Sequence, residues 1–193
     1  MVQSTGFNNI NTAVFISGTG SNLKSLIKFF KRKKYPIHTK LIISDNSKAN
    51  GLKYGNIFKI KKKVFNFKKK NLAEKKLLVE LKKNNIQLIC LAGFMKILSK
   101  NFIKKFRGKI LNIHPSLLPK YKGLNTHQRV LQSNEKYSGC TVHLVNSSLD
   151  SGKIILQSKI KIYKKDTPKS LATKILKEEH KLYPKAILKL FNL

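Results

Sequence analysis

The sequence predicts an α/β protein with a doubly wound, mostly parallel twisted sheet, flanking helices and antiparallel strands in the C-terminal part. Short apolar runs alternate with stretches of helical spacing through the first two thirds of the chain. The last third adds two apolar runs that read as a β-hairpin-like pair, and then one long helical stretch. With 193 residues the chain has the length of one domain. We expect a flexible leader over residues 1–12 and a single domain over 13–193.

The predicted strands are runs rich in apolar residues, and the predicted helices carry apolar residues along one side. Strands are expected over residues 13–16, 40–44, 57–60, 86–92, 109–114, 139–145 and 154–162. Helices are expected over residues 23–34, 48–54, 71–84, 99–106, 126–133 and 167–191. The lysine-rich run 59–70 is either an anion-binding loop or a mobile, solvated loop, and we favour the second.

Local signals fix several of these boundaries. The continuous apolar run 86–92 is typical of a central parallel strand that is covered on both faces. Pro115 ends the run 109–114, because the residue before a proline is held in an extended conformation. Ser99 is a natural helix cap, and Thr167 followed by Pro168 has the order expected of a cap and first helical turn.

The charge of the chain is strongly unbalanced, with 41 Lys and Arg residues against 8 Asp and Glu residues and a formal net charge of +33. Such an excess can indicate a nucleic-acid or anionic-membrane partner. Arginine, the better reader of bases and phosphates, occurs only at Arg32, Arg107 and Arg129. We therefore favour a compositional drift toward lysine over a nucleic-acid function.

The cysteine pattern indicates a reducing compartment. Cys90 and Cys140 lie in apolar runs, where single cysteines behave as small hydrophobic residues. Two such residues make neither a disulfide framework nor a metal site. The expected location is therefore cytoplasmic, and no apolar run has the length needed to span a bilayer.

Asn112 and His114 are the first candidate catalytic pair. In a strand over 109–114 their side chains point the same way, because successive residues alternate between faces. An amide N–H can stabilise a developing oxyanion while an imidazole moves protons at the same carbonyl carbon. The alternative is a buried Asn–His pair that satisfies a turn.

A glycine-containing turn follows the first predicted strand and precedes a helix. Its sequence, Ser-Gly-Thr-Gly-Ser-Asn over residues 17–22, offers backbone N–H groups and a helix N-terminus to a phosphate. Leu23 occupies the third glycine position of the dinucleotide fingerprint, so a single phosphate is better supported than a dinucleotide. The alternative is a tight turn in which Ser21 or Asn22 caps the helix.

Other candidate groups also lie at strand ends or in the last helix. The loop 93–98 is unusually apolar, and either binds a planar aromatic ligand or plugs the core. Asp150 lies in a polar turn, where a lone aspartate is usually a turn former. Glu178, Glu179 and His180 are notable because acidic residues are scarce in this chain, and the alternative is a helix salt bridge. Ligands of doubly wound sheets bind beyond the carboxyl ends of the strands, which favours the catalytic interpretation.

Several segments together resemble the folate-dependent formyltransferases, most closely the branch that acts on glycinamide ribonucleotide. The most specific segment is Leu-Asn-Ile-His-Pro-Ser-Leu-Leu-Pro over residues 111–119. The others are residues 16–23, 91–98, 139–145 and 149–152, together with 178–180 and 183–184. The resemblance implies the formyltransferase fold, and transfer of a formyl group from 10-formyltetrahydrofolate to the amino group of 5-phosphoribosylglycinamide in purine synthesis.

The resemblance also implies roles for individual residues. Asn112 would stabilise the oxyanion, His114 would transfer protons, and Asp150 would favour the charged form of His114. The ribonucleotide would be bound by Gly20, Ser21, Asn22, Leu176, Lys177, Glu178 and Glu179. The folate would be bound by Lys70, Met95, Lys96, Ile97, Leu98, Asn112, Asn146, Ser147, Ser148, Leu149 and Asp150. No metal or nucleic acid is implied, and the protein would be a monomer or a homodimer.

Some positions depart from the family pattern. Lys96 stands where arginine is common, Asn125 where histidine is frequent, and Ser151 where glycine is frequent. Lys70 is assigned across a variable loop. The competing functions are a methionyl-tRNA formyltransferase, a formyltetrahydrofolate deformylase or a basic nucleic-acid-binding module. The first two are expected to need a further domain, which this length does not accommodate.

Overall fold

The computed structural model describes residues 9–33 and 35–193, and residues 1–8 of the expected leader lie outside that part. Its strands are β1 (Ile10–Ile16), β2 (Ile37–Ser44), β3 (Lys61–Val64), β4 (Leu88–Leu91), β5 (Lys109–His114), β6 (Tyr137–Leu144) and β7 (Ile154–Lys161). Its helices are α1 (Ser21–Lys33), α2 (Lys53–Phe58), α3 (Lys70–Lys83), α4 (Lys100–Lys105), α5 (Thr126–Gln132) and α6 (Pro168–Phe191), with short 3-10 turns η1 (Asn50–Leu52) and η2 (Phe67–Lys69). Residues 10–12, expected in the leader, belong to β1.

The strands of the described chain form one sheet in the order β3-β2-β1-β4-β5-β6-β7. The first five strands pair in parallel, whereas β6 pairs antiparallel to both β5 and β7. This arrangement confirms the predicted mostly parallel sheet with antiparallel strands in the C-terminal part. The parallel strands present their carboxyl ends at one edge, where the candidate residues were expected.

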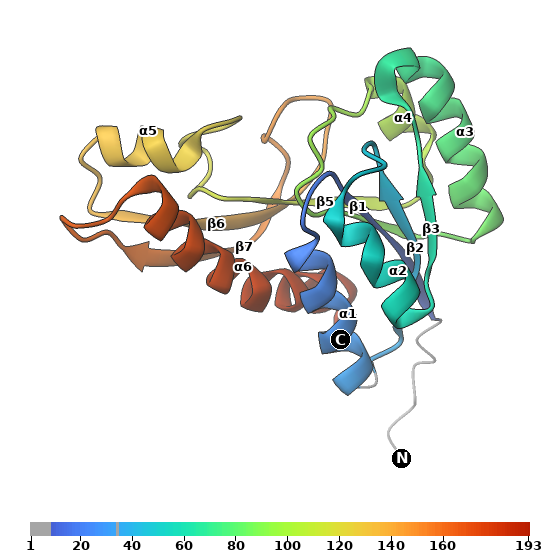
Figure 1. Cartoon of the computed structure of the whole chain (residues 1–193), viewed down its shortest axis with the longest axis horizontal. Helices are drawn as coiled ribbons and strands as arrows, with labels where there is room; N and C mark the ends of the chain where they lie inside the picture. Colours follow the sequence, from blue (N-terminus) through green and yellow to red (C-terminus); the bar gives the residue numbers. More distant parts are fainter. Residues whose placement is uncertain (1–8, 34) are drawn as a thin grey trace.

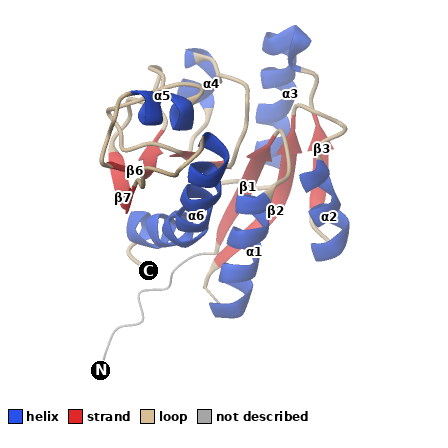
Figure 2. Ribbon diagram, turned by 60° about the vertical axis from the view of Figure 1, so that its left-hand side comes forward, coloured by secondary structure: helices blue, strands red, loops and turns tan. Residues whose placement is uncertain are grey.

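Helices cover both faces of the central sheet (Figures 1 and 2), with α1 and α6 on one side and α3 and α4 on the other. Alternate residues of β1 pack into the hydrophobic clusters on the two opposite faces of the sheet. Val14 and Ile16 join the cluster that includes side chains of α1 and α6, whereas Ala13 and Phe15 join the cluster that includes side chains of α3 and α4. Each fully buried aliphatic side chain stabilises such a core by about 1.5–3 kcal/mol. No described helix is both long enough and apolar enough to cross a membrane.

Tyr183 ties α6 to the centre of the sheet. Its side chain is completely buried, and its hydroxyl lies 3.0 Å from the carbonyl oxygen of Leu91 and 3.1 Å from that of Leu111. These carbonyls belong to β4 and β5, so one phenol joins the long helix to two neighbouring strands. Asn112 follows directly after Leu111, and the contact therefore supports the strand that carries the first candidate pair.

The glycine turn before α1 differs in detail from the prediction. Gly20 has φ +69 and its carbonyl accepts the Lys24 N–H, so Gly20 occupies the cap position and Ser21 is the first helical residue. The expected cap at Ser21 or Asn22 is therefore wrong. Glycine is required because a Cβ at residue 20 would lie 2.8 Å from the Cα of Gly51. The side chains of Ser21 and Asn22 do not cap the helix and are available for other contacts. Residue 34, at the end of the predicted helix, lies outside the described residues.

The strand predicted over 57–60 is wrong. Ile57 and Phe58 end α2, and Lys59 adopts a left-handed conformation with φ 55 before the chain enters β3. The true strand escaped detection because β3 lies at the sheet edge and is exposed along its whole length, so it shows no apolar pattern. Lysines on an exposed edge strand oppose pairing with other chains. The solvated loop expected over 59–70 is likewise replaced by β3 and η2.

Candidate active site

Two antiparallel strands place four polar side chains on one face of the sheet. Asn112 and His114 are two apart on β5, and their cross-strand partners on β6 are His143 and Thr141. Directly opposed residues of an antiparallel pair share a face, so the register adds His143 to the predicted pair. Sequence analysis gave His143 no role, since the pairing of β5 with β6 is what brings it to Asn112.

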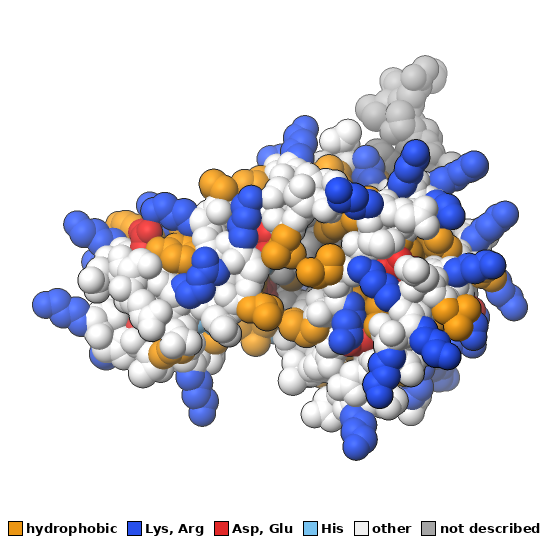
Figure 3. Space-filling view, turned by 90° about the horizontal axis from the view of Figure 1, so that it is seen from above, with side chains coloured by type: hydrophobic (Ala, Val, Ile, Leu, Met, Phe, Trp, Pro, Cys, Tyr) orange, Lys and Arg blue, Asp and Glu red, His pale blue; other side chains and the backbone are white. Residues whose placement is uncertain are grey.

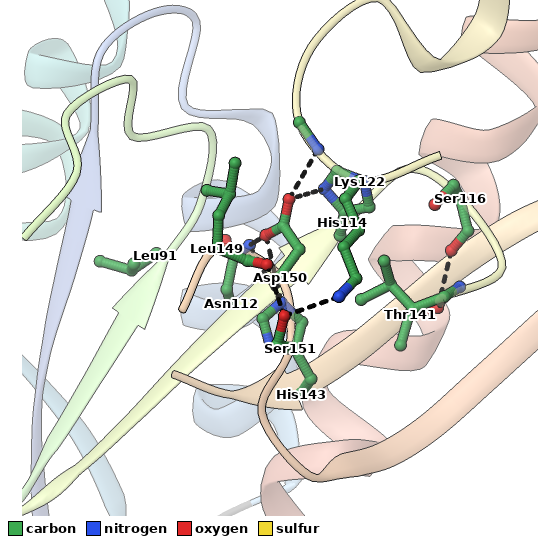
Figure 4. A network of polar contacts seen from close by, with 12 residues as sticks. Leu91, Asn112, His114, Ser116, Lys122, Thr141, His143, Leu149, Asp150 and Ser151 are labelled. Carbon is green, nitrogen blue, oxygen red and sulfur yellow. Dashed lines mark hydrogen bonds and ion pairs between the residues drawn. The ribbon is translucent and has the colours of Figure 1, made fainter. Parts of the chain in front are cut away.

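Asp150 lies at the centre of this cluster (Figure 4), in the loop between β6 and β7. Its Oδ2 atom is 3.3 Å from Nδ1 of His114, and its Oδ1 atom is 3.4 Å from Nδ2 of Asn112 and 3.6 Å from Nε2 of His143. The backbone N–H of Gly123 donates to Oδ2 over 2.9 Å. The structure thus brings together the three residues predicted as catalytic, with the Asp150 side chain only 7% exposed.

The contacts of His114 assign different tasks to its two nitrogens. Nε2 lies 2.9 Å from the carbonyl oxygen of Tyr121, and a carbonyl can only accept, so Nε2 carries a proton. Nδ1, which faces Asp150, is therefore the nitrogen that can gain or lose one. Burial lowers the pKa of His114, while the Tyr121 carbonyl and the Asp150 charge raise it. The expected effect of Asp150 on His114 has the right sign, but burial is larger and the net shift is downward.

Asp150 itself is held as a carboxylate. Burial favours its neutral form, but the contact with His143, the Gly123 N–H and the charge of His114 together lower the pKa of Asp150. A proton arriving at Nδ1 of His114 therefore meets a fixed negative charge. The arrangement stabilises an imidazolium at the moment when His114 accepts a proton.

His143 positions the amide of Asn112. The Nδ1 atom of His143 lies 2.8 Å from the Leu144 carbonyl and must carry the proton there, which leaves Nε2 of a neutral ring as an acceptor. Nδ2 of Asn112 lies 3.3 Å from that Nε2 atom. This contact and the one to Asp150 are both longer than the usual N–H···O or N–H···N optimum of about 2.9–3.0 Å. The amide is oriented, yet its N–H groups remain weakly bound.

Side-chain hydrogen bonds of Thr141 and Ser116 hold the loop after His114 in place. The Thr141 hydroxyl donates to the Ser116 carbonyl over 2.6 Å and accepts the N–H of Leu118 over 3.1 Å. The Ser116 hydroxyl donates to the Lys120 carbonyl over 2.7 Å. Because Ser116 and Thr141 are fully buried, these bonds hold the turn that presents the Tyr121 carbonyl to His114.

The residues predicted to bind the ribonucleotide divide into two sets. The Asn22 amide donates a 2.7 Å hydrogen bond to Oε2 of Glu179, so the glycine turn and α6 meet there. Both side chains are 7% exposed, and Oδ1 of Asn22 is buried without a partner among the described residues. Burial raises the pKa of Glu179 to about 7, against the lowering effect of the Asn22 bond.

The remaining predicted residues of α6 do not join that contact. Glu178 instead accepts from Ser158 over 3.1 Å and from Lys181 over 2.8 Å. The Lys181 hydrogen bond is the main cause of the lowered pKa of Glu178. Leu176 is half-buried and Lys177 is exposed, in the turn of α6 that precedes Glu178.

The loop 93–98 was expected either to bind a planar ligand such as the folate or to plug the core, and its residues divide between these two roles. Phe94 packs edge-to-face on Phe15 and on Phe67, and Leu98 is buried in the core, so the Leu98 side chain is not free to face a ligand. Met95 and Ile97 are instead 62% and 67% exposed. Part of the loop is a core plug, and the rest offers apolar side chains to the outside.

Hydrophobic side chains surround a hollow in the middle of the face seen from above (Figure 3), with Lys and Arg side chains around them. Leu149, in the loop that carries Asp150, is 53% exposed. In the same loop the Asn146 side chain accepts the Ser148 N–H over 3.0 Å, and Ser147 is exposed between them. The loop therefore adds one exposed apolar side chain and a polar turn to the predicted folate residues.

Lys70 has the least support among the predicted folate residues. It begins α3, directly after η2. Phe67 of η2 packs edge-to-face on Phe94 of the loop 93–98. The structure thus connects Lys70 to that loop through its neighbours rather than through its own side chain.

Alternative functional sites in the described chain would be a cavity, a metal-binding group or the two cysteines. A cavity of about 660 Å³, lined in part by Phe30, Tyr35 and Phe58, lies among the amino ends of β2 and β3, at the opposite edge of the sheet. Over residues 9–33 and 35–193 no group of three or more His, Cys, Asp or Glu side chains is arranged to hold a metal ion. Burial raises the pKa of both Cys90 and Cys140 to about 12, which makes these thiols unreactive.

Comparison with known proteins gives concordant matches. The formyl transferase family model matches residues 10–187. The chain is 39% identical to a phosphoribosylglycinamide formyltransferase of Haemophilus influenzae, over 91% of this chain and 84% of the relative. The crystal structure of phosphoribosylglycinamide formyltransferase from Brucella melitensis superimposes with a TM-score of 0.89 at 41% identity, covering 96% of each chain.

A longer relative matches over only part of its length. The chain is 42% identical to the trifunctional purine biosynthetic protein adenosine-3 of Drosophila melanogaster over 93% of this chain, but it spans only 14% of that protein. The fold, the family model and the relatives agree along nearly the whole described chain. The chain therefore belongs to the formyl transferase family.

Proposed function

We propose that this protein transfers the formyl group of 10-formyltetrahydrofolate to the amino group of 5-phosphoribosylglycinamide, a step of purine biosynthesis. The products are 5-phosphoribosyl-N-formylglycinamide and tetrahydrofolate. The observation that carries the proposal is the position of Asp150 between Asn112 and Nδ1 of His114. The names of the relatives support the choice of acceptor.

The proposed reaction is an acyl transfer through a tetrahedral intermediate. The neutral amine of the acceptor attacks the formyl carbon, and the carbonyl oxygen becomes an oxyanion. The Asn112 amide, whose present contacts are long, turns one N–H toward that oxyanion. Nδ1 of His114 accepts the proton that the amine loses, and Asp150 stabilises the imidazolium that results. The intermediate then collapses as the bond between the formyl carbon and N10 of the folate breaks. The imidazolium returns its proton to that nitrogen, and tetrahydrofolate leaves.

The two substrates are proposed to approach from different segments. The phosphate of the acceptor binds at Gly20, Ser21 and Asn22, where the first turn of α1 presents free backbone N–H groups. Glu179 contacts the glycinamide end through its position beside Asn22. The folate rests against the exposed apolar side chains of the loop 93–98 and of Leu149.

The chemistry needs no metal, because an amide dipole and a proton carrier with its counter-ion suffice for acyl transfer. 10-Formyltetrahydrofolate is consumed as a co-substrate. A cytoplasmic location and a monomeric or homodimeric state remain predictions.

Purified protein mixed with both substrates should release tetrahydrofolate only when 5-phosphoribosylglycinamide is present. His114→Ala should abolish this release while the far-UV circular dichroism spectrum remains that of a folded protein. Release without the acceptor would instead indicate a deformylase. No release with either mixture would reject the proposal.

The nucleic-acid alternative makes a different prediction. Binding that rests on lysine–phosphate contacts collapses as salt is added. Formyl transfer that survives at a salt concentration where RNA binding is lost would separate the two functions. We expect this outcome because none of the proposed catalytic contacts depends on the exposed lysines.

A further inference from the structure

Asp45, at the end of β2, connects the two segments proposed to hold the two substrates. Its Oδ1 atom accepts the Ser17 hydroxyl proton over 2.5 Å, and its Oδ2 atom lies 3.7 Å from Nζ of Lys96. Ser17 opens the glycine turn, whereas Lys96 lies in the loop 93–98. The Asp45 side chain is only 9% exposed, whereas the Lys96 side chain is 48% exposed, so the carboxylate is shielded from water on the Ser17 side and partly solvated on the Lys96 side.

The direction of the hydrogen bonds is fixed. A carboxylate only accepts, so the Ser17 hydroxyl must donate to Asp45 and keep its lone pairs for another donor. The backbone N–H of Met95 supplies that donor and lies 2.8 Å from Oγ of Ser17. One carboxylate thus holds two consecutive residues of the loop, Met95 through Ser17 and Lys96 directly.

Backbone hydrogen bonds also join the glycine turn to its neighbouring loops. The Ser17 N–H donates to the Gly93 carbonyl over 3.1 Å, and the N–H of Gly51 donates to the Gly18 carbonyl over 2.9 Å. A shift of the loop 93–98 therefore acts on Ser17, and through it on the turn that leads to Gly20. Hydrogen bonds to a charged acceptor are about twice as strong as neutral ones, so Asp45 is the strongest member of this set.

We infer that Asp45 is a positioning residue that couples binding of the formyl donor to binding of the phosphorylated acceptor. The inference rests on the proposed function, because it assigns the donor to the loop 93–98 and the phosphate to the glycine turn. When the donor fixes Met95 and Lys96, the contact through Asp45 and Ser17 fixes the turn for the acceptor. Coupling between two sites is reciprocal, so the acceptor tightens donor binding by the same factor.

The test separates the two arms of the Asp45 contact, which are the hydrogen bond from Ser17 and the ion pair with Lys96. Asp45→Ala removes both arms, Ser17→Ala removes only the link to Met95, and Lys96→Met removes only the charge on the loop. The matched control is Asp166→Asn, which weakens another carboxylate–lysine contact, with Lys174 near the start of α6. The dissociation constant of the acceptor is measured by calorimetry with and without tetrahydrofolate, and KM and kcat are measured for both substrates.

We expect tetrahydrofolate to tighten acceptor binding about tenfold in the wild type and less than twofold in Asp45→Ala. Asp45→Ala should also raise the KM of the donor more than it lowers kcat, with Asp45→Asn restoring part of the loss because its amide oxygen still accepts from Ser17. Equal coupling in Asp45→Ala, the control and the wild type would overturn the inference. The calorimetry needs no turnover, so absence of formyl transfer in the wild type would be a failure of the proposed function instead.

Discussion

The side-chain amide of Asn22 donates a 2.7 Å hydrogen bond to Oε2 of Glu179, which joins the first turn of α1 to the middle of α6. Both groups are almost completely buried. Because the pKa of Glu179 is raised to about 7, this carboxyl changes charge near neutral pH. The contact therefore links a proposed substrate-binding residue to the pH dependence of folding.

Stability should fall as this carboxyl loses its proton. The folded state binds more protons at Glu179 than the unfolded state between pH 4.5 and about 7, so the free energy of unfolding decreases as pH rises through that window. At 1.4 kcal/mol per pKa unit the loss is about 3 kcal/mol at most. Urea unfolding below and above the window should show this loss in the wild type but not in Glu179→Gln, which keeps the size and the acceptor. Identical pH dependence in both proteins would contradict the assignment.

Asp150→Asn should lower kcat about 10²–10⁴-fold, because the imidazolium of His114 loses its counter-ion. The negative charge of Asp150 raises the pKa of His114, so its removal lowers that pKa further. The acidic limb of the pH–rate profile should therefore move to lower pH. A limb that stays in place while kcat falls would show that Asp150 acts other than through His114.

His143→Phe should reduce kcat about tenfold with little change in either KM, since His143 orients an amide that works mainly in the transition state. A cycle with Asn112→Ala provides the check. If His143 acts through Asn112, the double variant should be no slower than Asn112→Ala alone. Additive losses would assign His143 a separate role.

Tyr183→Phe should destabilise the fold by about 1–3 kcal/mol, because it leaves buried carbonyls of β4 and β5 without their donor. Tyr163→Phe is the matched control, since Tyr163 is 53% exposed and its change should stay within about 0.5 kcal/mol. Urea denaturation of the two variants measures both values. Equal effects would mean that the Tyr183 hydroxyl contributes nothing beyond its ring.

The sequence was informative wherever burial left a pattern. β1, β4 and β5 are covered on both faces, and their apolar runs were recognised with errors only at their ends. β3 was missed because pairing with β2, rather than burial, makes it a strand. Edge strands of this kind depend on a neighbour that is distant in sequence.

The same distinction applies to the site. Asn112 and His114 were found from their spacing on one strand, whereas Asp150 was singled out only through the resemblance. His143 needed the antiparallel register, and the Asp45 contacts needed the packing of three loops. The direction in which the pKa of His114 shifts could not be predicted from the sequence either, because the extent of burial is a property of the folded chain.

The antiparallel turn of the sheet at β6 gathers Asn112, His114, His143 and Asp150 within one continuous stretch of the polypeptide. The segments proposed to bind the acceptor, at residues 20–22 and at Glu179, come from outside that stretch. Evolution can therefore exchange acceptors by altering the outer segments while the proton-handling unit is inherited intact.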